Sequence, residues 1–366
     1  MSIVITHLRN IASSLLREKQ YFLFTPTHAT IELTFRCNLL CSMCSVRKQG
    51  DDEDRRELSF DQICKVINDL CDMGVKSIRL IGAEPLIRKD LIDIIKHIKS
   101  KNIICDLATN GTLITKEIAK ELVSSKIDQI ALSVDAPNEL HDKVRGVKGA
   151  FKKVIEGLQY LSFEKRREES AVPRFNVRTT ISSINCNIEN LTAMVEFIKR
   201  NEIELFSFGL IRETPLDVVD KTVFKEEKIG TTRFLPESDS LLLDEDSLMK
   251  IKNEAAKNPA LKRALGEINY LSYDHLLKGT VPIKRCYQTH DVILINPYGD
   301  VIPCANLDRY VFGNVLKEDI QNIWRNSAHS ELTDHLEEMF FPMCDYCCHI
   351  QYTPLQVLKT IFGLKF

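Results

Sequence analysis

The chain has 366 residues, enough for two domains or for one large domain with an extension. Apolar residues make up 44% and charged residues 27%, which is ordinary globular composition and excludes disorder over most of the chain. Its 49 basic and 51 acidic residues leave a net charge of −2, so no global positive field favours nucleic acid, and no apolar run of about 18 residues predicts a membrane span.

The first residues predict an amphipathic helix and not a secretion signal. Apolar side chains recur at helical spacing over 3–19, and charged residues interrupt any apolar signal core. We therefore expect a cytoplasmic protein whose cysteines are reduced thiols. This helix either packs on the body of the protein, which we favour, or makes a peripheral membrane contact, for which it carries few basic residues.

From residue 29 onward, strand-like and helix-like segments alternate. The predicted strands are 29–35, 76–82, 103–110, 128–134, 175–181 and 204–210. The predicted helices are 59–74, 90–100, 115–125, 150–161 and 188–200, with Ser59 and Thr115 as N-caps of the first and third. This alternation is typical of a parallel sheet. The pattern alone leaves an open doubly wound sheet and a partial barrel as alternatives, because an eightfold barrel needs more units.

The remaining sequence predicts smaller elements. Residues 211–240 are polar and irregular, and indicate a linker or a lid. Helical patterning covers 241–278, a β-hairpin is predicted over 293–304 around a turn at Gly299, and another helix over 319–327.

Three cysteines follow the first predicted strand directly, as Cys37-x3-Cys41-x2-Cys44. Three thiolates within eight residues can hold one face of an iron–sulfur cluster and leave one iron open to a ligand. A structural zinc ion usually has four ligands. The alternatives are a zinc knuckle with a remote fourth ligand, or three ordinary core cysteines.

This cysteine motif, in its place after a first strand, resembles that of the radical S-adenosylmethionine (SAM) enzymes. The resemblance implies that the three cysteines bind a [4Fe–4S] cluster, and that the open iron is chelated by the amino and carboxylate groups of SAM. In that family the cluster cleaves SAM to a 5′-deoxyadenosyl radical, which abstracts hydrogen from a substrate. The resemblance also implies an α/β fold with a partial (β/α)6 TIM barrel.

The end of the second strand agrees with this resemblance. Gly82-Ala83-Glu84-Pro85 is similar to the family's GGEP motif, which binds the methionine amino group of SAM. Ala83 departs from that motif by one methyl group. Glu84 is a suitable acceptor for an ammonium group. The alternative is a simple turn with Pro85 as strand breaker.

The next strand ends carry further residues for which the resemblance implies cofactor contacts. Asn110, in a TNG sequence, either contacts the cofactor or only forms a turn. The stretch from Ser133 to Gly146 resembles the family's SxDG…HDxxRG. It implies Ser133 on the methionine carboxylate, Asp135 near the ribose, and Arg145 either on that carboxylate or in a surface salt bridge.

Three more polar residues lie close to these. We expect His141 to be a hydrogen-bonding loop residue and not a base. Thr180 and Ser182, at the fifth strand end, are candidates for lining the cofactor.

A second cysteine set comprises Cys286, Cys304, Cys344 and Cys347, and its four thiolates suit either zinc or an iron–sulfur cluster. The spacing resembles the SPASM/twitch extension of radical SAM enzymes, which implies an auxiliary [4Fe–4S] cluster. It is similar to the twitch of a dehydrogenase that oxidises an aminocyclitol, 2-deoxy-scyllo-inosamine dehydrogenase. The CxxC spacing assigns Cys347 to the cluster, so Cys348 is not needed as a ligand. Cys186 and Cys348 are candidates for hydrogen donors. The other cysteines read as buried hydrophobes.

The resemblance gives the expected domain organisation: an N-terminal helix (1–26), a radical SAM partial barrel (27–212), a linker and helical segment (213–280), an auxiliary-cluster region (281–352) and an amphipathic tail (353–366).

The resemblance predicts a radical SAM oxidoreductase that dehydrogenates a small molecule such as an amino sugar or cyclitol. Flavodoxin or ferredoxin is the expected electron donor, and no nucleic acid is expected as a partner. Only 36 residues precede Cys37, which favours a small molecule over a peptide that needs a leader-binding domain. The alternatives are a peptide maturase, a redox-neutral epimerase, or a non-catalytic metal-binding scaffold.

Overall fold

The structure is a computed structural model that describes residues 25–44, 46, 55–211, 213–235, 241–257, 259, 286 and 288–347. The predicted N-terminal helix over 3–19, the end of the predicted helical segment over 260–278, Cys348 and the predicted tail over 353–366 lie outside the described residues. Among the residues described, no helix combines the length and the apolar character that crossing a bilayer requires.

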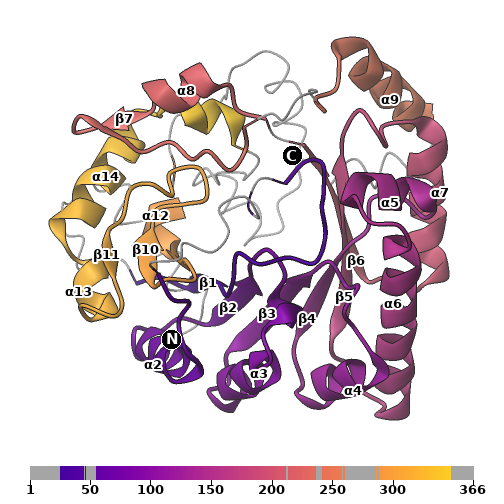
Figure 1. The fold of residues 1–366 in the computed structure, drawn as a ribbon, viewed down its shortest axis with the longest axis horizontal. Helices are drawn as coiled ribbons and strands as arrows, with labels where there is room; N and C mark the ends of the chain where they lie inside the picture. The colour runs from indigo at the N-terminus through magenta and orange to yellow at the C-terminus, as the bar shows by residue number, and fades with distance from the viewer. Residues whose placement is uncertain are drawn as a thin grey trace.

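Nine strands form one curved sheet, in the order β11-β10-β9-β1-β2-β3-β4-β5-β6 (Figure 1). These strands are β1 (His28–Glu32), β2 (Ser77–Ile81), β3 (Ile104–Thr109), β4 (Gln129–Ser133), β5 (Arg174–Ile181), β6 (Leu205–Leu210), β9 (Val292–Ile295), β10 (Asp300–Ile302) and β11 (Gly313–Asn314). Neighbouring strands from β1 to β6 are all parallel, in sequence order. This confirms the partial barrel and excludes the doubly wound sheet, whose strand order reverses.

Helices follow the outer side of this sheet in Figure 1. They include α2 (Phe60–Asp72), α3 (Leu91–Ser100), α4 (Lys116–Ser124), α6 (Ala150–Arg167) and α7 (Ile188–Arg200). Alternate strand residues such as Ala29 and Ile31 are buried in the main hydrophobic core, which includes residues of these helices. By strand alternation, the neighbours Thr30 and Glu32 lie on the inner face.

Local signals determine several helix boundaries as predicted. Ser59 caps α2 in a capping box with Gln62, and Thr115 caps α4 by accepting from Ile118 N–H. Helix α7 has the predicted bounds, whereas α6 runs six residues beyond the predicted end at residue 161. That last stretch is charged and hides the apolar periodicity, and Arg167 forms an ion pair with Glu164 there.

Four helices have no counterpart in the prediction. They are α5 (Glu139–Arg145), α8 (Leu216–Lys221), α12 (Gln288–Asp291) and α14 (Ser327–Glu338). Helix α5 spans only seven residues, of which His141 and Val144 are buried, so it is too short to produce an apolar periodicity.

The region predicted as a linker or lid is instead folded against the rest of the chain over 213–235. It contains α8 (Leu216–Lys221) and a hairpin of β7 (Val223–Phe224) and β8 (Glu227–Lys228), followed after a gap by α9 (Glu245–Lys257). Phe224 packs edge-on against Tyr310 and Phe341, with ring centroids 5.4 and 6.0 Å apart. The buried Thr222 hydroxyl accepts a hydrogen bond from Met343 N–H. The segment therefore braces the C-terminal region.

The C-terminal elements continue the barrel sheet. The predicted hairpin forms as β9 and β10, with Gly299 at φ +87° in its turn, and β9 pairs in parallel with β1. The short elements around it are α12 (Gln288–Asp291), α13 (Ile320–Trp324), and two 3-10 turns at Pro85–Ile87 and Pro342–Tyr346. Because β9 borders β1, the late cysteine region is attached to the strand that leads into the first cysteine motif.

Candidate active site

The first cysteine motif lies in the loop that follows β1. Cys37, Cys41 and Cys44 are free thiols, close enough to influence one another electrostatically. Burial raises the pKa of the Cys37 and Cys41 thiols, and the Arg145 guanidinium opposes that rise at Cys41. Partly buried thiols that must lose their protons together need a cationic centre between them. The donor set therefore fits an iron–sulfur cluster.

The loop between β2 and α3 holds the start of this cysteine loop. Ala83 N–H donates to Thr34 O at 2.8 Å, and Glu84 N–H donates to Arg36 O at 3.0 Å. A Cβ at residue 82 would lie 2.6 Å from Thr34 O, which explains why this position is glycine. Residues 82–84 thus fix the backbone that enters the cysteine motif.

Helix α5 holds the other side of the cysteine loop. Leu40 N–H donates to Arg145 O at 3.1 Å, and Ser42 N–H donates to Val144 O at 3.2 Å. Gly146 has φ +68°, and a Cβ there would lie 2.1 Å from Leu40 O. The Arg-Gly pair of the HDxxRG stretch thus supports the cysteine loop through its backbone.

Glu84 is fully buried at the centre of the site. Its carboxylate accepts hydrogen bonds from the Thr109 hydroxyl (2.7 Å), Asn110 N–H (2.7 Å) and Leu86 N–H (3.0 Å). Burial raises the pKa of Glu84, and these hydrogen bonds oppose the rise. The carboxylate is therefore held in one orientation, and its oxygens retain lone pairs for a further donor.

Asn110 connects β3 to the cysteine loop. Its amide nitrogen lies 3.8 Å from Cys37 Sγ and donates to Asn38 Oδ1 at 2.9 Å. Its amide oxygen accepts from Thr112 N–H at 2.9 Å, which fixes the turn. Asn110 thus forms the predicted turn and lies beside one of the three cysteines, and its predicted contact with the cofactor stays a prediction. Asn38, which the sequence analysis missed, carries no motif signal.

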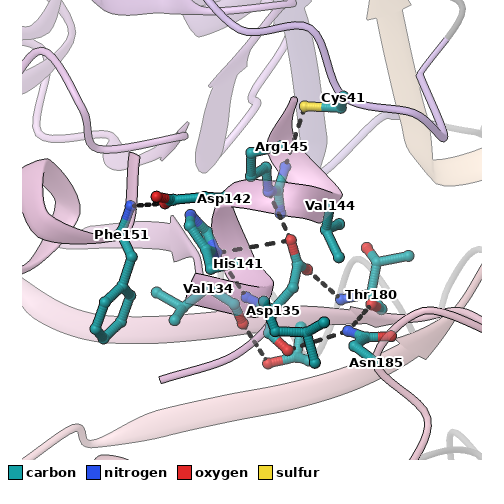
Figure 2. A network of polar contacts seen from close by, with 12 residues as sticks. Cys41, Val134, Asp135, His141, Asp142, Val144, Arg145, Phe151, Thr180 and Asn185 are labelled. Atoms are coloured by element: carbon teal, nitrogen blue, oxygen red, sulfur yellow. Dashed lines mark hydrogen bonds and ion pairs between the residues drawn. The ribbon is translucent and has the colours of Figure 1, made fainter. Parts of the chain in front are cut away.

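Asp135 and Arg145 form a buried ion pair beside Cys41, as Figure 2 shows. Arg145 Nε lies 2.6 Å from Asp135 Oδ2, and Arg145 Nη1 lies 3.9 Å from Cys41 Sγ. The Arg145 side chain is 11% exposed, so the surface salt bridge proposed as its alternative role is wrong. Asp135 Oδ1 accepts from Thr180 N–H at 2.9 Å, so both carboxylate oxygens have protein partners. Its predicted ribose contact stays a prediction.

His141 is buried next to this pair, and its Nδ1 accepts from Asp135 N–H at 3.1 Å. Burial lowers the pKa of His141 to about 4 and the nearby Arg145 adds to the effect, so the ring is neutral near pH 7. Ring contact with Phe151 and this backbone hydrogen bond give His141 a structural role, although it lies in helix α5 and not in the predicted loop.

Ser133 ends β4 and is half-buried, in register with Arg178 on β5. Thr180 is half-buried on β5, on the same side of that strand as Arg178. Ser182 is buried in the following turn, where its hydroxyl donates to Asn185 at 3.2 Å. Ser182 therefore stabilises the turn, and its predicted place along the cofactor stays a prediction.

The four late cysteines come together from three separate segments. Cys344 interacts electrostatically with Cys286, Cys304 and Cys347, and Cys304 interacts with Cys347. Burial raises the pKa of Cys304 to about 12 and raises that of Cys344 well above its ordinary value, and the neighbouring thiolates add to both shifts. Cys286 and Cys344 are buried, and Cys304 and Cys347 are half-buried. Four thiols that interact in this way have the chemistry of a fully ligated metal centre.

Cys186 follows β5 in the chain and is half-buried, packed against the main hydrophobic core. Burial raises its pKa to about 12, which keeps it a neutral thiol. Its role as a hydrogen donor stays a prediction, and Cys348 lies outside the described residues.

Comparisons with known proteins agree with this geometry. The radical SAM superfamily model matches residues 31–164, and an iron–sulfur cluster-binding domain model, SPASM, matches residues 286–349. An AdoMet-dependent heme synthase of Methanosarcina barkeri is 26% identical over 81% of each chain. Mycofactocin maturase MftC of Mycolicibacterium smegmatis is 28% identical over 86% of this chain and 73% of the maturase.

Among solved structures, Streptococcus suis SuiB bound to S-adenosylmethionine has a TM-score of 0.61 and covers 89% of this chain and 72% of SuiB. At 17% identity this likeness shows the fold. The matched segments 31–164 and 286–349 contain the two cysteine sets. The chain therefore contains a radical SAM domain and a SPASM domain, which imply S-adenosylmethionine, a [4Fe–4S] cluster and an additional iron–sulfur cluster as its cofactors.

Proposed function

We propose that this radical SAM enzyme is an oxidoreductase of the cytoplasm that dehydrogenates a small molecule such as an amino sugar or a cyclitol. The observation that carries the proposal is that Cys286, Cys304, Cys344 and Cys347 lie close enough to influence one another electrostatically. Four thiolates fill the ligand shell of one cluster, and a closed shell suits electron transfer and not substrate ligation.

When bound, SAM and the first cluster supply a hydrogen-abstracting radical, and one auxiliary [4Fe–4S] cluster supplies an electron acceptor. Cys37, Cys41 and Cys44 would hold the first cluster. Glu84, with its orientation fixed by three hydrogen bonds, would accept from the methionine ammonium, and Ser133 would bind its carboxylate. The substrate would lose one hydrogen atom, then one proton and one electron, which amounts to a two-electron oxidation. Flavodoxin or ferredoxin is the proposed electron donor.

The names of the relatives support two substrate classes. The heme synthase relative, aligned over 81% of both chains, favours a small molecule. The alternative is a peptide maturase, and its support is the maturase relative together with SuiB, whose structure bound to the precursor peptide SuiA covers 93% of this chain. An epimerase, with Cys186 or Cys348 as hydrogen donor, is a further alternative.

A Cys344→Ala/Cys347→Ala double variant tests the electron-acceptor role. We expect the reconstituted variant to cleave SAM to 5′-deoxyadenosine at a rate within about threefold of the parent, because its first cysteine motif is intact. Net oxidation should be lost, because the electron of the substrate has no acceptor. Candidate amino sugars, cyclitols and short peptides are assayed by mass spectrometry for a loss of two hydrogens. An unchanged yield of oxidised product in the variant contradicts the proposal.

A further inference from the structure

A buried arginine touches one cysteine of the first motif. Arg145 Nη1 lies 3.9 Å from Cys41 Sγ, and Arg145 Nε lies 2.6 Å from Asp135 Oδ2 (Figure 2). The Arg145 side chain is 11% exposed and that of Asp135 is fully buried. A charged donor beside a ligand sulfur in such a place acts with little screening by water.

The protein holds this arginine in one pose. Asp135 Oδ1 accepts from Thr180 N–H at 2.9 Å, which ties the carboxylate to β5. The backbone of Arg145 is tied to the cysteine loop through its carbonyl, which accepts from Leu40 N–H at 3.1 Å. Strand β5, helix α5 and the cysteine loop therefore meet at one guanidinium.

The neighbouring groups leave Arg145 as the cation of this network. His141 Nδ1 accepts from Asp135 N–H at 3.1 Å, so this ring nitrogen carries no proton. Because His141 is neutral, Arg145 is the charged group that pairs with the Asp135 carboxylate in the network of Figure 2. The positive charge of Arg145 therefore lies next to Cys41, and the negative charge of Asp135 lies on the other side of Arg145.

We propose that Arg145 is a positioning residue that raises the reduction potential of the first cluster through Cys41, and that Asp135 limits this effect. Reduction adds negative charge to a cluster, and a cation or hydrogen-bond donor at a ligand sulfur stabilises that charge. Removal of the cation should therefore lower the potential, and removal of the carboxylate charge should raise it. The inference rests on the family assignment and not on the proposed substrate.

Redox titration of the reconstituted protein without SAM or substrate, followed by electron paramagnetic resonance, tests this. We expect Arg145→Gln to lower the ratio of reduced to oxidised first cluster at a fixed potential by about tenfold, about 59 mV for one electron. Asp135→Asn should shift the same ratio in the opposite direction. Cys344→Ala/Cys347→Ala is present in all proteins, so that the signal comes from the first cluster alone.

Lys143→Gln is the matched control, because it removes the same charge from an exposed position on the same helix. It should leave the potential at the parent value. Iron content and SAM affinity are measured for every variant. If Arg145→Gln fails to bind four irons, Arg145→Lys replaces it in the comparison. Lysine keeps the positive charge, so the potential of this variant should differ less from that of the parent than the potential of Asp135→Asn does.

Two results would overturn the proposal. One is a potential in Arg145→Gln and Asp135→Asn that matches the Lys143→Gln control. The other is a shift of both variants in the same direction, which a general loosening of the loop would produce. A weaker affinity for SAM with an unchanged potential would assign Arg145 to the SAM carboxylate instead, and would leave the proposed dehydrogenation standing.

Discussion

Replacing Arg233 by alanine is expected to lower the free energy of unfolding by about 3–5 kcal/mol. Arg233 lies between two buried carboxylates, with Nη1 2.6 Å from Glu32 and Nε 2.6 Å from Asp308. Glu32 ends β1 directly before the first cysteine loop, and Asp308 follows Cys304. Without the guanidinium, two neighbouring carboxylates stay buried with no counter-charge.

Urea unfolding of the unreconstituted protein measures this effect. The matched control is Lys228→Ala, which breaks an exposed ion pair with Asp220 and should cost less than about 1 kcal/mol. The triple variant Arg233→Met/Glu32→Gln/Asp308→Asn should be more stable than Arg233→Ala, because it leaves no buried charge unpaired. If Arg233→Ala is no less stable than the control, the ion-pair cluster does not hold the two regions together.

Replacing Glu84 by glutamine is expected to weaken SAM binding by roughly 10- to 150-fold, the loss of one hydrogen bond to a charged group at 1.5–3 kcal/mol. Glutamine has nearly the same shape but lacks the charge that an ammonium requires, and its amide would place a donor against Asn110 N–H or the Thr109 hydroxyl. Isothermal titration of SAM into the anaerobically reconstituted protein measures the change.

Thr109→Val is the matched variant for this prediction. It removes the hydroxyl that donates to Glu84 at 2.7 Å but keeps the carboxylate, so SAM affinity should stay within about threefold of the parent. Iron content confirms that both proteins hold their clusters. Equal affinities of Glu84→Gln and the parent would show that another group receives the methionine ammonium.

The parallel barrel follows from sequence because its signals are local and repeated. Ser59 and Thr115 satisfy backbone N–H groups at helix starts, and the apolar alternation of each strand is strong enough to survive an error of a residue or two at its ends. The pairing of β9 with β1 has no local signal, since it joins residues more than 260 positions apart. The sequence also gives no signal that segment 213–235 is folded, because its helix and strands are only two to six residues long.

The candidate site divides in the same way. Cysteine spacing and Glu84 can be read from the chain, because their chemistry requires those side chains. The contacts of Arg145 with Asp135 and Cys41 depend on α5, whose seven residues leave no periodic pattern. The sequence shows Gly146 only as the last residue of a motif. Glycine is required there because the Leu40 carbonyl approaches closely, and this is a tertiary contact that the sequence does not reveal.

The most direct measurement is the iron and sulfide content per chain after anaerobic reconstitution. The parent is compared with a Cys37→Ala/Cys41→Ala/Cys44→Ala variant. We predict about eight irons in the parent and about four in the variant, because each cysteine set binds one four-iron cluster. A parent with about four irons and a variant with none would contradict the two-cluster account, and would leave the late cysteines without an electron acceptor to hold.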